Sequence, residues 1–74
     1  MIQLPNIGEI ITLETGDATV LDIANRYGDI TLLAGRAHPF HPFATWKLDT
    51  HSGALFAGHY FKDLAEAEID FNQR

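Results

Sequence analysis

The chain has 74 residues, and its ten acidic and five basic side chains give a net charge of −5. Its apolar fraction of 46% is typical of a globular protein, and its length suffices for a single domain over residues 1–74. The lack of cysteine excludes disulfides, thiol catalysis and Cys-bound metal centres. The acidic balance argues against nucleic acid as a partner. No apolar run approaches the roughly 18 residues of a membrane span, and the N-terminus lacks a signal-peptide pattern, so we expect a cytoplasmic protein without membrane contact.

The first half of the chain predicts three strands separated by turn signals. Residues 8–14 contain a β-branched run, and residues 15–17, Thr-Gly-Asp, are typical of a turn. Residues 18–25 form the second strand, which pairs with the first as a hairpin. After a further turn, residues 30–34 form the third strand.

Residues 18–25 also fit a short helix. Asp17 would be its N-cap and Gly28 would follow its end, and the run DIANRYG is similar to the opening helix of a helix-turn-helix. The strand is favoured because the segment is short, contains several β-branched residues and has turn signals on both sides. No second, basic helix follows that could read DNA.

The second half predicts two strands joined by a hairpin, and then a helix. Residues 35–42 are expected to be a loop, because two prolines there remove backbone donors. Residues 43–48 and 54–61 are the next two strands, joined by the loop 49–53, and the helix spans residues 63–72. These elements predict an α+β fold: an antiparallel meander of four or five strands, strongly bent and barrel-like, closed by one C-terminal helix.

The helix has a defined start and an amphipathic pattern. Asp63 is its predicted N-cap, and Glu66 sits three residues on, as a capping-box partner would. The apolar face that should dock on the sheet comprises Leu64, Ala67 and Phe71. Ile69 lies on a flank of this face, so it is exposed unless the sheet curls round to cover it. The acidic outer face comprises Asp63, Glu66, Glu68 and Asp70.

The hairpin of residues 43–61 has one apolar and one mixed face. If Leu48 lies opposite Ala54, then Trp46 faces Phe56, and we expect Trp46 to be the buried central anchor of the fold. The predicted core face comprises Ala44, Trp46, Leu48, Phe56 and Tyr60. The mixed face, which is the better candidate for binding, comprises Phe43, Thr45, Lys47, Leu55, Ala57, His59 and Phe61. A slip of one residue in the register would exchange the two faces.

The histidines are the candidate metal ligands of this chain. His38 and His41 fall one turn apart in a polyproline-like stretch, about 9 Å along its axis, which is long for chelating one ion. His41 could pair with His59, because the expected register places Phe43 opposite His59. No carboxylate stands at a recognised ligand spacing beside His38, His41 or His59. We therefore expect hydrogen-bonded or solvated histidines, with no metal and no cofactor.

The residues for catalysis are poorly arranged. Ser52 is a possible nucleophile between His51 and Gly53 at a hairpin tip, but adjacency in sequence does not make a catalytic triad. The glycines are not spaced as a phosphate-binding loop, and the lysine that should follow such a loop is missing. We expect no catalytic residue and no enzyme activity.

A three-part pattern covers residues 42–74. It reads P-[aromatic]-x-T-W-x-x-D, then G-H-Y-F, then E-A-x-x-D-F-x-x-R. The pattern resembles small bacterial proteins of plasmids, phages and other mobile elements. The resemblance implies no activity, because no function is assigned to these proteins. Ala57 stands where the resemblance predicts tryptophan or another aromatic residue, so this chain lacks one surface aromatic.

The sequence thus favours a non-catalytic interaction module, a monomer that binds another protein through its sheet or its acidic helix. The candidate contact residues are Phe43, Lys47, His59, Glu66, Ile69 and Asp70. Two alternatives stay open. One is a histidine-based metal-binding protein. The other is a single-strand nucleic-acid binder that stacks bases on surface aromatics and has only Arg26, Arg36 and Lys47 to line a basic groove.

Overall fold

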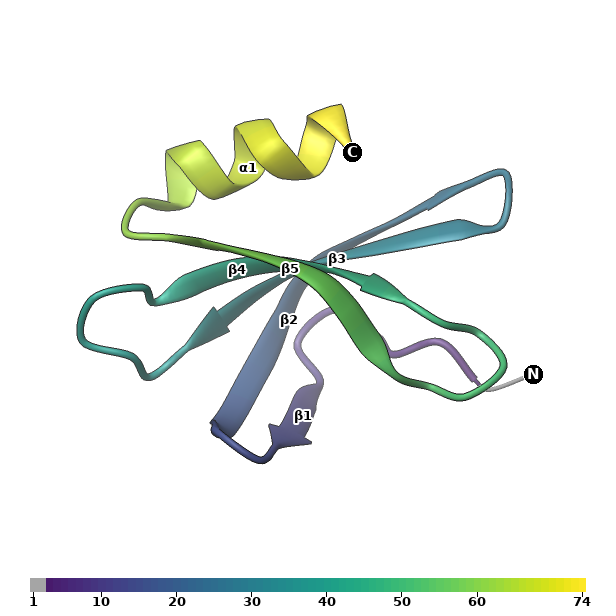
Figure 1. The fold of residues 1–74 in the computed structure, drawn as a ribbon, viewed down its shortest axis with the longest axis horizontal. Coiled ribbons are helices and arrows are strands. Elements are labelled where there is room, and N and C mark those ends of the chain that lie inside the picture. Colours follow the sequence, from purple (N-terminus) through teal and green to yellow (C-terminus); the bar gives the residue numbers. More distant parts are fainter. Residues whose placement is uncertain (1–2) are drawn as a thin grey trace.

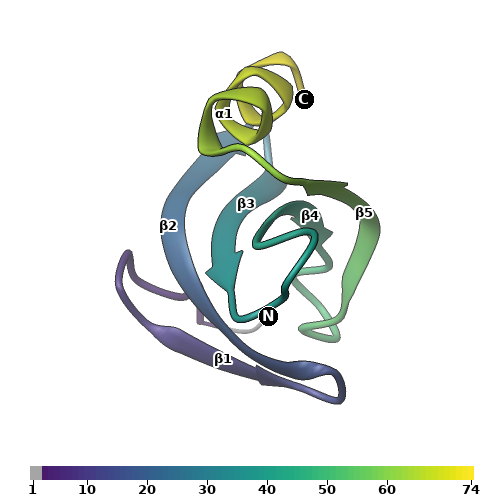
Figure 2. The ribbon, with the colours of Figure 1, turned by 90° about the vertical axis from the view of Figure 1, so that its left-hand side faces the viewer.

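The computed structural model describes residues 3–74 as a five-stranded antiparallel sheet with one helix packed on it (Figure 1). The elements are β1 (Ile10–Leu13), β2 (Gly16–Arg26), β3 (Asp29–Arg36), β4 (Phe43–Leu48), β5 (Leu55–Phe61) and α1 (Leu64–Gln73). The strands lie in chain order, so the predicted α+β meander is confirmed. The sheet curls strongly, but β1 and β5 do not pair, and the sheet stays open rather than closing into a barrel (Figure 2). Within residues 3–74, no helix has the length and apolar character to cross a membrane.

The ambiguous segment 18–25 lies inside the long strand β2, so the helix alternative is wrong. β2 pairs with β1 through a tight turn in which Leu13 is opposite Gly16, and Gly16 has a φ of 122°. At its other end β2 joins β3 through Tyr27 and Gly28, both at positive φ. A two-residue turn with positive φ at both positions, as at Tyr27 and Gly28, matches the right-handed twist of the strands that it connects.

Every strand except β4 differs from its predicted bounds by one or two residues. β1 begins at Ile10 rather than at residue 8, and β3 continues through Gly35 and Arg36, which the sequence predicts as loop. Arg36 pairs with Ala18 of β2, and Gly35 pairs with residues on both neighbouring strands. Ladder pairing with β2 and β4 therefore extends β3 until the prolines end it.

The curled sheet buries a separate core on each face. The inner core comprises Ala18, Val20, Ile30, Leu32, Ala34, Ala44, Trp46 and Leu48. Leu4, ahead of β1, packs into the same core. On the outer face, Ala67 and Phe71 of α1 are buried against Leu33 of β3. Because both faces carry apolar side chains, β3 is buried along most of its length.

The register of the β4–β5 hairpin differs from the expected one. Leu48 lies opposite Leu55 rather than Ala54, and a β-bulge then shifts the pairing so that Thr45 faces His59. Ala57, inside this bulge, has a φ of 52°. The extra residue in β5 breaks the alternation that the prediction assumes.

The bulge decides which hairpin residues are buried. Ala44, Trp46 and Leu48 are buried, and Trp46 is 6% exposed, which confirms it as a core anchor. Phe56 and Tyr60, by contrast, are 53% and 48% exposed, so their assignment to the core is wrong. Phe56 faces Lys47 in the actual pairing, not Trp46.

The helix docks through fewer residues than its apolar pattern predicts. Ala67 and Phe71 are buried as expected, but Leu64 is 38% exposed because it lies at the edge of the helix–sheet contact. Ile69 is exposed, since the sheet does not curl round to reach it. Asp63 occupies the N-cap position without a side-chain hydrogen bond to the helix, so the predicted capping box is wrong.

Candidate functional site

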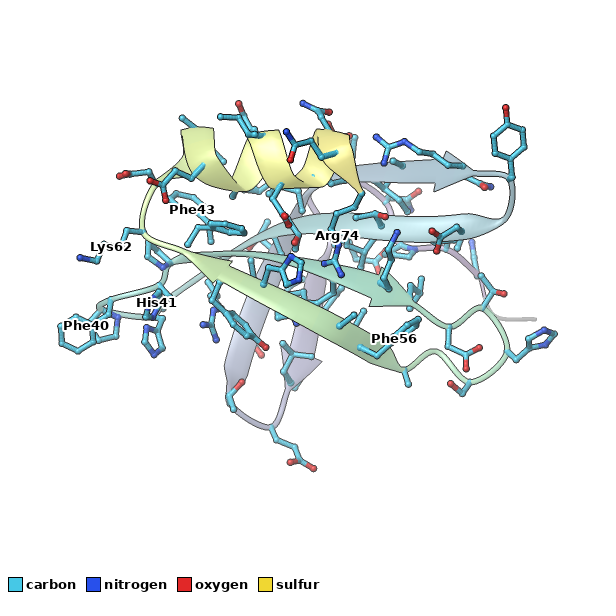
Figure 3. The ribbon with its side chains drawn as sticks, turned by 45° about the horizontal axis from the view of Figure 1, so that its top comes forward. Phe40, His41, Phe43, Phe56, Lys62 and Arg74 are labelled. Carbon is cyan, nitrogen blue, oxygen red and sulfur yellow. The ribbon has the colours of Figure 1, made fainter. Side chains whose placement is uncertain are left out.

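A polar network joins α1 to β4 and β5 on the outer face. The Thr45 hydroxyl donates to Asp70 Oδ2 over 2.6 Å, and His59 Nδ1 lies 2.9 Å from the same oxygen. Arg74 Nη1 donates to Thr45 Oγ1 and to the Thr45 carbonyl oxygen, 3.0 and 3.3 Å away. Arg74 extends from the end of α1 toward the sheet (Figure 3). Thr45 and His59 therefore meet at one oxygen of Asp70, and Asp70 and Arg74 meet at the hydroxyl of Thr45.

The network favours ionised Asp70. Partial burial works to raise the pKa of Asp70, but the hydrogen bonds from Thr45 and His59 and the positive charge of Arg74 outweigh it, and the pKa lies below its usual value of 3.8. The hydroxyl of Thr45 is engaged by the carboxylate, not by the imidazole. The hydrogen bond from the Thr45 hydroxyl to Asp70 therefore ties α1 to β4.

The network explains part of the three-part sequence pattern. Four polar residues of the pattern make up the network, although they are far apart in sequence: Thr45, His59, Asp70 and Arg74. Two further members make an aromatic contact: the rings of Trp46 and Tyr60 meet edge to face, with centroids 6.2 Å apart. These parts of the pattern have a structural role in this fold.

The six predicted contact residues do not form one surface. Phe43 lies between α1 and the sheet (Figure 3), and Lys47 Nζ is held by Asp29 and Thr31 at 2.7 and 3.0 Å. His59 and Asp70 bind one another. The two that remain, Glu66 and Ile69, are exposed on α1.

Two of the histidines lie close together, since the ring centroids of His38 and His41 are 5.7 Å apart. His38 Nδ1 accepts hydrogen bonds from the backbone N–H groups of Phe40 and His41 at 3.2 and 2.9 Å. His59 lies opposite Thr45 rather than Phe43, so the register argument for pairing it with His41 is wrong. In the part of the chain that the structure describes, no group of three or more His, Asp or Glu side chains is placed to hold a metal ion.

The basic residues of the nucleic-acid alternative are engaged in internal contacts. Arg26 Nη1 donates to the Phe71 carbonyl oxygen over 3.3 Å, and Lys47 binds Asp29. The Arg36 guanidinium donates to the His41 carbonyl oxygen and lies 4.6 Å from the centroid of the Tyr60 ring. Each of these three basic groups is therefore engaged by residues of the same chain and not directed toward a common groove.

The open side of the sheet carries a shallow hollow of about 310 Å³ between the β1–β2 turn and β5. Its lining comprises Leu13, Glu14, Thr15, Arg36, Trp46, Leu55 and Tyr60. The polar and aromatic groups here already contact one another, because Arg36 covers the Tyr60 ring and Tyr60 contacts Trp46. The groups in this hollow that could bind a ligand thus already have partners within the chain.

A larger groove runs along α1 on the side of β2. This α1–β2 groove, of about 470 Å³, is lined by Leu21, Asp22, Leu33, Leu64, Glu68, Phe71 and Asn72. It meets a second open hollow of about 530 Å³, the β2–β3 shelf, lined by Asp17, Thr19, Leu21, Gly35, Arg36, Ala37 and Phe43. Leu21 lines both, so the two hollows lie on either side of this side chain.

The groove exists because α1 covers only part of the outer face. The helix contacts β3, β4 and β5. Near the end of the helix, Arg26 of β2 donates to the Phe71 carbonyl oxygen, and Ala24 of β2 packs against the cluster that contains Phe71. A β-bulge at Leu21 puts both Leu21 and Asp22 along the groove. The sequence does not predict this surface, because Val20-Leu21-Asp22 alternates normally and the bulge depends on the pairing with β3.

Comparisons of the chain with protein-family models, with curated proteins and with solved structures give no match. The candidate site is therefore defined by the geometry and chemistry of its own residues.

Proposed function

We propose that the protein is a non-catalytic, cytoplasmic module that binds another protein through the α1–β2 groove. The observation that carries this proposal is the uncovered strip of sheet beside the helix, where Leu21 and Leu64 are 37% and 38% exposed on the two sides of the same groove. Ile10 pairs with Thr19 and so lies on the same face, 63% exposed. Exposed apolar side chains that gather on one face are typical of contact sites for other proteins.

The charge of the molecule also supports a protein partner. The net charge is −5, and the groove lining contains the exposed carboxylates Asp22 and Glu68. A single-stranded nucleic acid would need a basic groove to follow its phosphates, and the basic groups that could supply one contact the fold instead. We further propose that the module acts as a monomer and without chemistry of its own, and that it belongs to a plasmid, phage or other mobile element, as the resemblance of residues 42–74 implies.

The test is a pull-down from the source cell with matched surface variants. Leu21→Lys places a charge in the groove, and Phe56→Lys places the same charge outside it, on an exposed apolar side chain of β5. A partner retained by the wild type and by Phe56→Lys, and lost from Leu21→Lys, supports the proposal. A partner lost only from Phe56→Lys, or salt-sensitive retention of nucleic acid in place of protein, would overturn it.

A further inference from the structure

The shape of the outer face fits a second helix beside α1. The helix contacts β3, β4 and β5 and is therefore centred near β4. β2 lies two strands from β4, which is about 9.6 Å at the usual spacing of neighbouring strands. Packed helices lie roughly 8–10 Å apart. A helix seated above β2 would thus contact the sheet below it and α1 beside it at normal packing distances.

The side of α1 that faces this space has the spacing of a helix-packing ridge. Leu64, Glu68 and Asn72 line the groove and follow one another at intervals of four residues. Residues at this spacing form the ridges that fit into the grooves of a neighbouring helix. The sheet below offers Leu21 and Gly35, and Leu21 Cδ1 lies 3.5 Å from where a Cβ of residue 35 would stand. Leu21 in the groove and Gly35 in the shelf thus offer apolar surface among the polar side chains of the lining.

The position of the groove favours a helix over an extended segment. Its floor is the face of the sheet, where side chains project and backbone hydrogen-bonding groups do not. An extended peptide lying there would leave its own N–H and C=O groups without backbone partners, whereas a helix pairs them internally. The free strand edges, where an extended peptide could bind, are those of β1 and β5 and not the floor of the groove.

Charge selects the chemistry of the occupant. The groove and the shelf carry the exposed carboxylates of Asp17, Asp22 and Glu68, and Arg36 is the single basic side chain in their lining. Arg36 is itself turned to His41 and Tyr60. A second copy of this chain would bring its own carboxylates against these carboxylates, and the like charges would repel. Lysine or arginine on the flanks of an apolar helix would complement them.

We infer that the α1–β2 groove receives an amphipathic helix of a partner protein, with an apolar stripe that packs on Leu21 and Leu64 and basic residues that meet Asp22 and Glu68. This inference rests on the proposed function and specifies the partner. The docked helix would complete a layer of two helices on the outer face of the sheet.

The probes are three labelled peptides of about 18 residues, long enough for roughly 27 Å of helix. The first has leucine and alanine at helical spacing with lysine on both flanks. The second replaces each lysine by glutamate, and the third keeps the composition of the first but has two central prolines. Binding is followed by fluorescence anisotropy, and peptide helicity by circular dichroism.

The protein variants are Glu68→Lys in the groove and Glu66→Lys outside its lining, which make the same charge change on the same helix. We expect the lysine peptide to gain helicity on binding and to bind at least about 10-fold more tightly than the glutamate peptide, since charge complementarity sets the choice of partner. Glu68→Lys should weaken binding of the lysine peptide by roughly fivefold, which is about 1 kcal/mol of binding free energy. Glu66→Lys should weaken it by less than about twofold.

The outcomes separate the two proposals. Equal binding of the proline peptide, equal effects of Glu68→Lys and Glu66→Lys, or no binding of the lysine peptide would overturn the helical, basic partner. If the pull-down partner is nevertheless lost from Leu21→Lys, the groove remains a protein-binding site and the partner takes another form. If that partner is lost only from Phe56→Lys, the proposed function itself fails.

Discussion

Gly58 leaves room for the main anchor of the inner core, and replacing it by alanine tests that packing. A Cβ at this position would stand 2.8 Å from Trp46 Nε1, 2.9 Å from Trp46 Cδ1 and 2.6 Å from the Tyr60 hydroxyl oxygen. The Tyr60 hydroxyl, at the end of a half-exposed side chain, can move away. The Trp46 indole, which is 6% exposed and enclosed by the core, cannot.

The magnitude follows from two opposing effects. Overpacking in a filled core costs roughly 1–3 kcal/mol. Replacing glycine by alanine also restricts the unfolded chain and returns about 0.4–1 kcal/mol where the backbone allows it. Gly58 does not have a positive φ, so the clash alone opposes the substitution. We expect Gly58→Ala to lower the free energy of unfolding by about 1–2 kcal/mol, out of roughly 4–11 kcal/mol for a chain of this length.

The assay is urea denaturation followed by far-UV circular dichroism, with Gly35→Ala as the matched control. Gly35 also lies in a strand without positive φ, and its added Cβ would meet Leu21 at an ordinary 3.5 Å. This control should be unchanged or slightly more stable. Trp46→Phe, which removes part of the indole, should cost less in the Gly58→Ala background than alone. Equal stability of Gly58→Ala and Gly35→Ala would refute the packing argument.

Three further predictions concern the bulge, the polar network and the helix surface. Ala57→Gly should raise the free energy of unfolding by about 0.5–1 kcal/mol, because Ala57 has a φ of 52° that favours glycine; a loss of stability in the same assay would contradict this. Because the pKa of Asp70 is lowered in the folded state, its contribution to stability is complete above its unfolded value of 3.8 and is lost as the pH falls through the folded value. The stability gap between the wild type and Asp70→Asn should therefore shrink from pH 6 to about pH 3, and a gap independent of pH would refute the assignment. Sedimentation at micromolar concentration should give a monomer, because Ile69 is exposed among carboxylates that repel a second copy; a tight dimer that Ile69→Lys dissolves would contradict it.

Local patterns predicted the order and type of every element in the described chain. The turn at Thr15 to Asp17 and the β-branched content of residues 18–25 were enough to favour β2 over a helix. The burial of Trp46, Ala67 and Phe71 followed from periodicity in the same way. Such signals are local, because each depends on residues that lie close together in the sequence.

The features that depend on pairing between strands were not predictable. The two β-bulges, at Leu21 and at Ala57, each insert one residue and reverse the faces beyond it. Phe56 lies on the face of Lys47 because Leu48 pairs with Leu55 rather than Ala54, whereas Tyr60 lies on the predicted face, opposite Ala44, and stays half exposed on the edge strand β5. The candidate site is not predicted for the same reason, because Leu21 reaches the groove only through its bulge. Leu64 is partly exposed because α1 covers only part of the outer face of the sheet.

The most direct measurement of the central claim locates the bound helix on the surface. A nitroxide placed at the centre of the lysine peptide broadens backbone amide signals within a limited distance of its binding position. The account predicts broadening at Leu21, Asp22, Leu64 and Glu68, which line the α1–β2 groove, with Phe56 and Tyr60 of β5 unaffected. Broadening centred on β5, or spread evenly over the acidic surface, would contradict the claim that this groove is the binding site.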